Sequence, residues 1–412
     1  MTQRVVVTGI GIVSPIGTGV DRFWNAILAE EIGISQLTRF DASTYSSQLA
    51  AEVRDFDPAD HMEKRRIRWT DRFSQFAIAG ARGALEDAGL NVERGRGDAG
   101  VFIGSALGGV AYADEQHDVF RERGLDAVRP LLAISVFGGA ATCNVALEFD
   151  FRGPTVANAN SCAAGAVAIG DAFRAIRRGD VRIALAGGVE APLSPLTFGA
   201  FTIIGAMSKR NGDPLHASRP FDRERDGFVM AEGSGILVLE RYEDAVSRGA
   251  RIYGEIRGFA ASNDAHHMSA PRPDGESAAR AMRNALDEAR LGVDELEALN
   301  AHGSSTPLGD RFEVVAVRRA MGDEISSRLP VTATKGQHGH GFGASGAWES
   351  AASLLALRTG KLPRVVGLEV DDPACDLAFV RTTTTRTVRT VLSNTTGFGG
   401  LNAALAFAAV ES

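Results

Sequence analysis

The sequence has little cysteine and no long apolar run, and both shortages exclude whole classes of protein. Three cysteines, Cys143, Cys162 and Cys375, cannot make a disulfide framework for 412 residues, which favours a reducing compartment. No apolar run reaches the length of a membrane span, and the run near the N-terminus lacks the apolar region of a signal peptide. We therefore expect a cytoplasmic protein that does not enter a membrane.

The sequence also lacks an excess of positive charge. Its 44 Lys and Arg residues are outnumbered by 51 Asp and Glu residues, which gives a formal net charge of −7. Such a chain has no general attraction to nucleic acid or to anionic membranes. No Pro-rich or Ser-rich linker interrupts it, so we expect one compact unit made of two halves, residues 1–250 and 251–412.

The two halves carry a similar alternation of strands and helices. In the first half, apolar runs and helical periodicity predict strands at 4–9, 101–104, 181–186 and 235–239, and helices at 71–88, 111–123, 135–147 and after Cys162. In the second half they predict strands at 252–258, 298–301, 330–334, 391–394 and 403–407, and helices at 276–289, 310–321 and 345–357. Residues 31–60 are expected to be irregular. The pattern predicts a duplicated α/β fold with buried sheets.

Cys162 follows a β-prone run, residues 154–159, and opens a helix that begins with small residues. Small neighbours let a thioester approach closely, and the positive end of a helix dipole favours the thiolate form of a cysteine. A lone cysteine of this kind is more often a core residue than a nucleophile. The catalytic interpretation therefore depends on residues elsewhere in the chain.

Two histidines supply that support. His302 follows a predicted strand and precedes a glycine, and His340 lies in a glycine-rich turn before a predicted helix. Such positions face the crevice where α/β proteins bind ligands. Each histidine alone could be a turn residue, but the three side chains together predict a catalytic centre.

At this point the chain resembles the β-ketoacyl-acyl-carrier-protein synthases of the synthase II type, in the thiolase-like superfamily. The similarity extends from Val-Thr-Gly-Ile-Gly at 7–11 to Gly-Phe-Gly-Gly at 397–400. It includes Ser-Arg-Pro-Phe-Asp at 218–222, Arg-Asp-Gly-Phe at 225–228 and Cys-Asp-Leu at 375–377. The resemblance implies a five-layered α-β-α-β-α fold, a homodimer, and decarboxylative Claisen condensation of an acyl-enzyme with malonyl-acyl-carrier protein. It implies no metal ion or organic cofactor, since the substrates travel on the phosphopantetheine of the carrier.

The resemblance also implies a role for each site residue. Cys162 would carry the acyl chain, and His302 and His340 would bind the malonyl thioester carbonyl, with Lys335 and Glu349 supporting the pair. The remaining assignments are the backbone N–H groups of Cys162 and Phe398 as oxyanion hole, Phe398 as gate of the acyl pocket, and Ser304 and Thr306 as phosphopantetheine contacts. Two imidazole donors suit the chemistry because losing one donor to a developing oxyanion typically costs ~10²–10³ in rate.

Several positions depart from the family pattern, which leaves the shape of the pocket and the gate open. They are Ser161, Ser304, Gln337, His338, Gly341, Phe342 and Leu401. We expect His338 to pack or to bond water. One alternative is a subunit that works in a heterodimer with a non-catalytic chain-length partner. Another is a thiolase acting on coenzyme A, which is disfavoured because Phe398 occupies the place of its second cysteine.

Two further expectations concern binding. The run Lys64, Arg65, Arg66 and Arg68 is local positive charge in an acidic chain, and in the family this segment lies at the carrier dock. We expect Lys64, Arg65 and Arg68 to steer the acidic carrier, with Lys209 and Arg210 as weaker candidates. The small residues Ala111 and Ala113 are expected to line a roomy acyl pocket. The sequence leaves the pathway open between fatty acid and type II polyketide synthesis.

Overall fold

The computed structural model describes residues 3–91 and 98–410, and its sheet has a strand order that occurs twice. The strands of the first half are β1 (Val5–Ser14), β5 (Gly100–Gly104), β6 (Thr155–Asn158), β7 (Ile183–Glu190) and β9 (Gly233–Arg241). Those of the second half are β10 (Gly254–Asn263), β11 (Ala298–Asn300), β12 (Val331–Thr332), β15 (Thr390–Gly397) and β16 (Leu401–Ala408). Across the sheet, the first half has the order β6-β5-β7-β9-β1 and the second half has the order β12-β11-β15-β16-β10. When the five strands of each half are numbered along the chain, both orders become 3-2-4-5-1. The predicted duplication is confirmed.

The first strands of the two halves join them. β1 and β10 pair antiparallel over a short stretch, with Val5 opposite Ile256 and Val7 opposite Gly254. The second, third and fourth strands of each half run parallel, because the second pairs in parallel with both others. The carboxyl ends of β6 and β12 are therefore available to carry equivalent turns.

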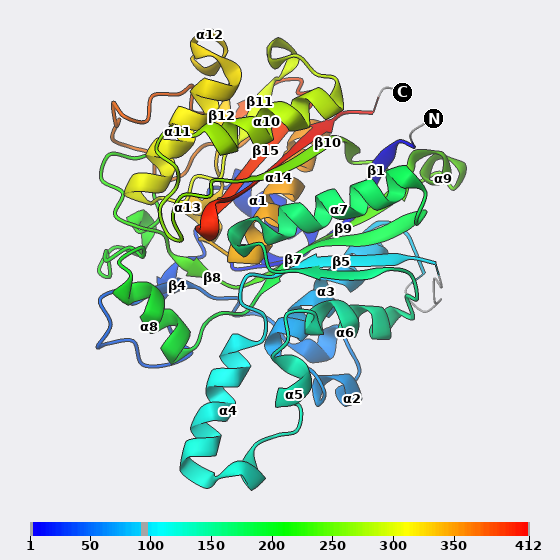
Figure 1. The fold of residues 1–412 in the computed structure, drawn as a ribbon, viewed down its shortest axis with the longest axis vertical. Coiled ribbons are helices and arrows are strands. Elements are labelled where there is room, and N and C mark those ends of the chain that lie inside the picture. The colour runs from blue at the N-terminus through cyan, green and yellow to red at the C-terminus, as the bar shows by residue number, and fades with distance from the viewer. Residues whose placement is uncertain (1–2, 92–97, 411–412) are drawn as a thin grey trace.

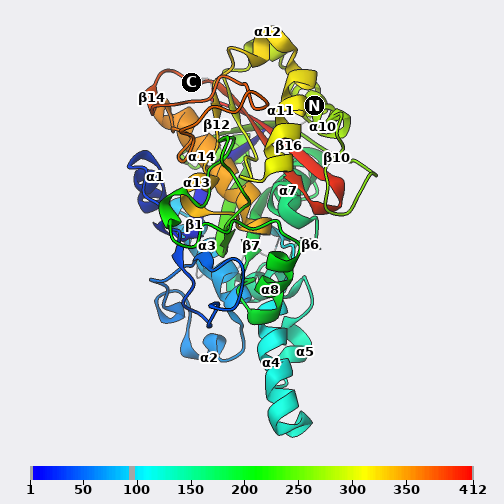
Figure 2. The same ribbon diagram turned by 90° about the vertical axis from the view of Figure 1, so that its left-hand side faces the viewer.

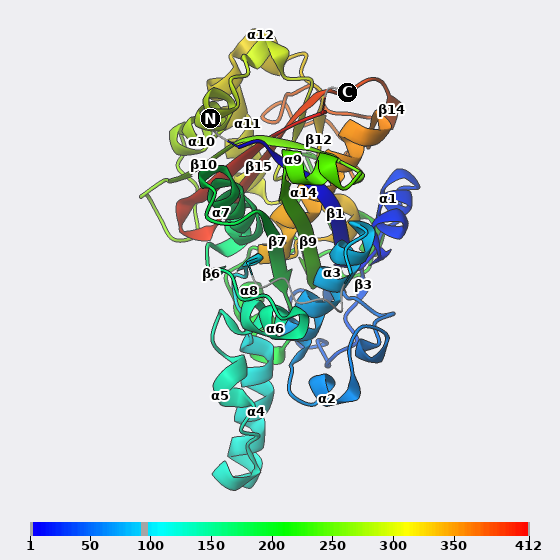
Figure 3. The same cartoon turned by 90° about the vertical axis from the view of Figure 1, so that its right-hand side faces the viewer.

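Six helices complete five layers, which follow one another from bottom to top in Figure 1. α3 (Arg72–Asp87) and α6 (Ala140–Phe149) cover the outer face of the first half, and α10 (Glu276–Ala289) and α11 (Pro307–Met321) that of the second. α7 (Ala164–Arg178) and α14 (Ser345–Thr359) lie between the two halves (Figure 3). This is the expected α-β-α-β-α arrangement. It places the helices that follow β6 and β12 in one central layer.

The central helices approach each other because glycines lie at their N-terminal turns. A Cβ on Gly165 would lie 2.4 Å from the carbonyl oxygen of Gly343, and one on Gly346 would lie 3.0 Å from Ala166. α14 is buried from Ser345 to Leu357, as expected for a helix covered on every side. Close packing of these two helices brings the Cys162 and His340 turns together.

Smaller elements surround this core. They are β2 (Gly17–Thr18), β3 (Ser35–Gln36), β4 (Leu49–Ala51), β8 (Met230–Ala231), β13 (Lys361–Leu362), β14 (Thr384–Thr385), α1 (Val20–Leu28), α2 (Lys64–Ile67), α4 (Val110–Arg123), α5 (Leu132–Ser135), α8 (Pro195–Ile203), α9 (Tyr242–Ser247), α12 (Asp323–Ser326) and α13 (Lys335–His338). α4 and α5 project from the body of the molecule (Figure 2). Within the described ranges, no helix has the length and apolar character needed to cross a bilayer.

Two expectations about local structure are wrong. The helix expected over 135–147 is broken into α5 and α6, because Gly138 and Gly139 lie in the turn between them. The segment 31–60, expected to be irregular, contributes β3 and β4 to a small sheet with β8. β8 pairs in parallel with β4, so a partner about 180 residues away supplies the order that local sequence did not indicate.

Candidate active site

Cys162 lies in the turn that joins β6 to α7. Residues Ser161–Ala163 form one 3₁₀ turn, and α7 continues from Ala164. Ser161 has a φ of 52°, a left-handed conformation that a non-glycine residue adopts only under tertiary constraint. The thiol is 6% exposed and faces the turn of the other half. The predicted strand, cysteine and helix are all in place.

His302 and His340 approach this thiol from the second half. His302 follows β11, and His340 lies between α13 and the 3₁₀ turn Phe342–Ala344 that opens α14. The Nε2 atom of His340 is 3.2 Å from the Sγ atom of Cys162, across 178 positions of sequence. The two imidazole rings are 5.2 Å apart and nearly perpendicular. The structure therefore brings the three predicted residues into one group.

Lys335, which is paired with Glu349, contacts His302 on the Nδ1 side of its ring. The Lys335 ammonium forms an ion pair with Glu349, bonds the carbonyl oxygen of His302 and lies 3.2 Å from its Nδ1 atom. A cationic ammonium offers only donors, so Nδ1 accepts and the proton of the neutral ring resides on Nε2. The backbone N–H groups of His302 and Gly303 donate to Glu313 over 2.7 and 2.8 Å. His302 thus presents a fixed N–H donor.

Burial decides the protonation states of the three residues. It holds the pKa of both histidines well below its usual range, and the Lys335 charge acts in the same direction. Both imidazoles are neutral near pH 7. Burial also raises the pKa of the Cys162 thiol to about 11. Burial thus acts against the helix dipole, which favours the thiolate form of Cys162.

A cavity of about 370 Å³ opens onto the three residues. Ser304, Thr306 and Phe398 line it, as do the apolar side chains of Ile204, Met268 and Leu308. The backbone N–H of Phe398 lies beside the Cys162 thiol and acts to lower its pKa, which places this N–H next to the reacting atom. The hydroxyls of Ser304 and Thr306 lie 2.8 Å apart. The residues expected at the oxyanion hole and along the phosphopantetheine arm thus share one cavity with the thiol.

The two alanines expected in the acyl pocket do not line the cavity described around Cys162. Ala111 lines a separate cavity of about 270 Å³ with Tyr112 and Ser194, and Ala113 lines neither cavity. Both belong to α4, which runs outward from the body (Figure 2). The cavity next to Cys162 is lined by other residues, and a role of Ala111 and Ala113 in the acyl pocket stays a prediction.

An aromatic group that the sequence analysis did not assign packs beside the thiol. Phe342 stacks on His340, with ring centres 5.1 Å apart, and lies 5.0 Å from Phe201 of α8. Phe201 in turn stacks on Phe398 at 6.3 Å. The departure from family pattern at Phe342 was the available signal. Its partner Phe201, on a helix that no motif marked, became apparent only from the fold.

The remaining candidates separate into structural and exposed residues. His338 is buried and bonds Thr334 and the carbonyl of Gly339, each at 2.8 Å, so it packs as expected. Cys375 is buried in the second half and does not line the cavity of Cys162. Lys64, Arg65 and Arg68 are exposed on and beside α2. Arg66 differs from them, because it is partly buried and ion-paired with Glu148.

Comparisons with known proteins agree with this geometry. Family models described as "Beta-ketoacyl synthase, N-terminal domain" and "Beta-ketoacyl synthase, C-terminal domain" match residues 2–245 and 253–369. The 3-oxoacyl-[acyl-carrier-protein] synthase 2 of Synechocystis sp. is 40% identical over 407 residues, or 98% of each chain. Two solved structures, each 33% identical and covering all of both chains, are the ishigamide ketosynthase/chain length factor, with a TM-score of 0.91, and a type II polyketide synthase ketosynthase in complex with its acyl-carrier protein, with a TM-score of 0.90.

Proposed function

Because the chain belongs to the β-ketoacyl synthase family, we propose that it performs the decarboxylative condensation of an acyl-cysteine with malonyl-acyl-carrier protein. The observation that carries the proposal is the 3.2 Å approach of the His340 Nε2 atom to the Cys162 sulfur, beside a second neutral imidazole. The product is a 3-oxoacyl thioester on the carrier.

Acyl loading uses Cys162 and His340. The thiol gives its proton to Nε2 of His340 as Sγ attacks the incoming thioester carbonyl, and the proton then passes to the departing pantetheine thiolate. The N–H groups of Cys162 and Phe398 stabilise the oxyanion. Ser345 lies 2.9 Å from Nδ1 of His340, and its hydroxyl can donate or accept. It therefore suits His340 both as proton acceptor and, after loading, as donor.

Condensation uses both histidines as neutral donors. The malonyl thioester oxygen accepts from Nε2–H of His302 and of His340 while the C–C bond to the carboxylate breaks and carbon dioxide leaves. The electron pair forms an enolate, whose α-carbon attacks the acyl-cysteine carbonyl and expels the Cys162 thiolate. Because Lys335 binds Nδ1 of His302, the donor of that ring is always aimed at the cavity. No step in this scheme requires a metal ion or organic cofactor.

The proposed partner is an acyl carrier protein that delivers substrates on phosphopantetheine. Ser304 and Thr306 would contact the arm, and Lys64, Arg65 and Arg68 would attract the acidic carrier. Support comes from the solved ketosynthase in complex with its acyl-carrier protein. The pathway is fatty acid or type II polyketide synthesis, and coenzyme A thiolysis is disfavoured because Phe398 holds the place of a second cysteine.

We propose a homodimer, with a heterodimer as the alternative because a similar structure is a ketosynthase/chain length factor. The proposed subunit interface lies at the first half, where β6 is an edge strand that a second subunit could pair with. Apolar side chains are exposed on β6 and in the neighbouring segment from α5 to α6, namely Val156, Ile134, Phe137 and Leu147. Residues 1–250 and 251–412 are the proposed structural halves. Native mass measurement of the chain alone, and with a homologue that lacks the cysteine, distinguishes the two assemblies.

The two half-reactions test the reaction itself. Cys162→Ala should abolish acyl loading yet retain some release of carbon dioxide from malonyl carrier, because both imidazole donors remain. His302→Ala should do the reverse, since Cys162 and His340 still load the acyl group. Loading is measured as an intact-mass shift and decarboxylation with labelled malonyl carrier. Loss of both half-reactions in every folded variant would show that this division of roles is wrong.

A further inference from the structure

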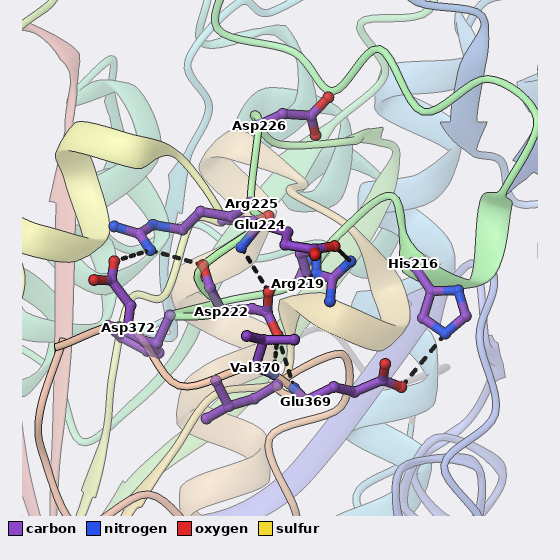
Figure 4. A network of polar contacts seen from close by, with 12 residues as sticks. His216, Arg219, Asp222, Glu224, Arg225, Asp226, Glu369, Val370 and Asp372 are labelled. Carbon is purple, nitrogen blue, oxygen red and sulfur yellow. Dashed lines mark hydrogen bonds and ion pairs between the residues drawn. The ribbon is translucent and has the colours of Figure 1, made fainter. Parts of the chain in front are cut away.

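Arg225 is a buried cation beside the loop that carries Ser304 and Thr306. Its side chain is 5% exposed, and its guanidinium donates to Asp372 over 2.7 Å and to the carbonyl of Asp222 over 2.7 Å. Two further bonds reach the carbonyls of Thr306 and Pro307, at 3.2 and 3.1 Å. Figure 4 shows Arg225 directed at Asp372 within a network that the segment around residues 216–226 forms with residues 369–372. Arg225 thus bonds the main chain of the candidate pantetheine loop directly.

The same segment holds the strained residue at the centre of that loop. Ser305 has a φ of 67° and is fully buried. Its hydroxyl accepts from the N–H of Arg219 over 2.9 Å, and its carbonyl accepts from the N–H of Gly227 over 3.1 Å. A non-glycine residue keeps such a conformation only where its surroundings determine it. Arg219 and Gly227 therefore help to shape the turn that carries Ser304 and Thr306.

Asp310 links Arg225 to the two hydroxyls. It accepts from the Ser304 hydroxyl over 3.1 Å and from the N–H groups of Ser305 and Phe221 over 3.0 and 2.7 Å, and Arg225 lies 3.6 Å away. Burial raises the pKa of Asp310, and these donors and the Arg225 charge oppose that shift. The Oδ1 atom of Asp310 accepts from the Ser305 N–H, and the Ser304 hydroxyl donates to the same atom.

The directions of the other bonds then follow. Since the Ser304 hydrogen goes to Asp310, the 2.8 Å contact with Thr306 requires the Thr306 hydroxyl to donate. The Thr306 oxygen also accepts from the N–H of Gly309 over 3.1 Å, and the Ser304 oxygen accepts from the N–H of Thr306 over 3.4 Å. Both hydroxyl hydrogens are thereby used inside the protein. The Ser304 oxygen has no free lone pair, so what the pair offers to the cavity is the remaining lone pair of Thr306, which matches an amide N–H group of a pantetheine arm.

We propose that Arg225 is a positioning residue for the pantetheine arm: it fixes the loop 304–307, in which Ser304 holds the Thr306 hydroxyl oriented as an acceptor for an amide N–H group of the arm. The inference rests on the proposed function, which brings a pantetheine thioester to this cavity. It predicts that loss of Arg225 weakens recognition of the arm more than it weakens chemistry at Cys162.

The test compares two acyl donors, an acyl-pantetheine and the matching S-ethyl thioester, which has no amide. For Arg225→Met, KM for acyl-pantetheine should rise about tenfold while kcat changes little, as expected for lost hydrogen bonds to a charged group. The preference for pantetheine over the S-ethyl donor should fall by the same factor. Arg225→Lys, which keeps the charge, should regain part of the preference. Arg318→Met on α11, whose ion pair with Asp376 is partly exposed, is the matched control and should keep it.

The outcomes separate this inference from the function on which it rests. Equal losses with both donors in Arg225→Met would mean a general structural role and would overturn the inference. If that variant does not fold, Asp372→Ala decides, since it removes one Arg225 partner and should lower the same preference. An unchanged preference there overturns the inference. A double Ser304→Ala and Thr306→Val variant that retains the preference would overturn the pantetheine contact itself. The double variant could instead lower the preference for acyl-pantetheine while the Arg225 variants keep it. That result would support the pantetheine contact and reject the role of Arg225.

Discussion

Ser161 and Phe342 occupy equivalent positions in the two halves and share the same unusual backbone. Each is the first residue of a 3₁₀ turn that follows the third strand of its half and opens a central helix, and their φ angles are 52° and 44°. The residues after them, Cys162 and Gly343, are equivalent as well. The duplicated fold thus provides two similar turns, one with the thiol and one with an aromatic ring beside it.

Phe342 should influence which acyl chains Cys162 accepts. Its ring belongs to the apolar cluster around the thiol, so Phe342→Leu should free space there. We expect loading of longer acyl groups to rise about tenfold relative to acetyl, the order of selectivity that small changes in apolar pocket volume give. Intact-mass loading with acyl donors of graded length measures this. Ala111→Phe, in the separate cavity, is the control and should leave the profile unchanged. The reverse pattern would place the acyl pocket at α4.

The alkylation rate of Cys162 should keep rising with pH well above neutrality. Because burial raises the thiol pKa to about 11, the thiolate fraction increases about tenfold per pH unit throughout the accessible range below that value. Iodoacetamide modification followed by intact mass between pH 6 and 9.5 measures the profile. A Cys143→Ser background removes the exposed thiol. A plateau below pH 8 would instead indicate a stabilised thiolate and contradict the effect assigned to burial.

The buried pair Lys335–Glu349 should matter for stability and for decarboxylation in different ways. Lys335→Met leaves Glu349 without its cation and should lower the free energy of unfolding by about 3–5 kcal/mol. The double variant Lys335→Met with Glu349→Leu removes both charges and should regain most of that stability in chemical denaturation. Its decarboxylation should remain low, because nothing then fixes the tautomer of His302. Recovery of decarboxylation together with stability would rule out the tautomer role.

Charge reversal on α2 should affect the carrier and not the fold. Changing Lys64, Arg65 and Arg68 to Glu should raise KM for malonyl carrier and flatten its dependence on salt. The same change at the exposed residues Arg280, Arg311 and Arg328 alters net charge equally and serves as control. Arg66→Glu should lower thermal stability instead, since Arg66 is ion-paired with Glu148. Equal KM values for the two triple variants would exclude α2 as the docking site.

The sequence by itself determined the order of elements and the identity of the reactive side chains. Strand, turn and helix around Cys162 and His340 follow from local periodicity and glycine placement, which act over a few residues and can be read from the chain. His302 followed from its position at the end of a predicted strand, whereas Lys335 and Glu349 followed from family resemblance. The break between α5 and α6 was missed although Gly138 and Gly139 mark it, because helical periodicity continues on both sides.

Only the tertiary structure decided what those side chains do to each other. Cys162 lies at a helix N-terminus in sequence, but its ionisation is set by burial against residues 178 positions away. Ala111 lines a cavity separate from the one at the thiol, and the buried contacts of Arg225 link residues 222, 306, 307 and 372. Desolvation and long-range packing depend on which distant segments of the chain contact each other, and these contacts cannot be predicted from the local sequence pattern.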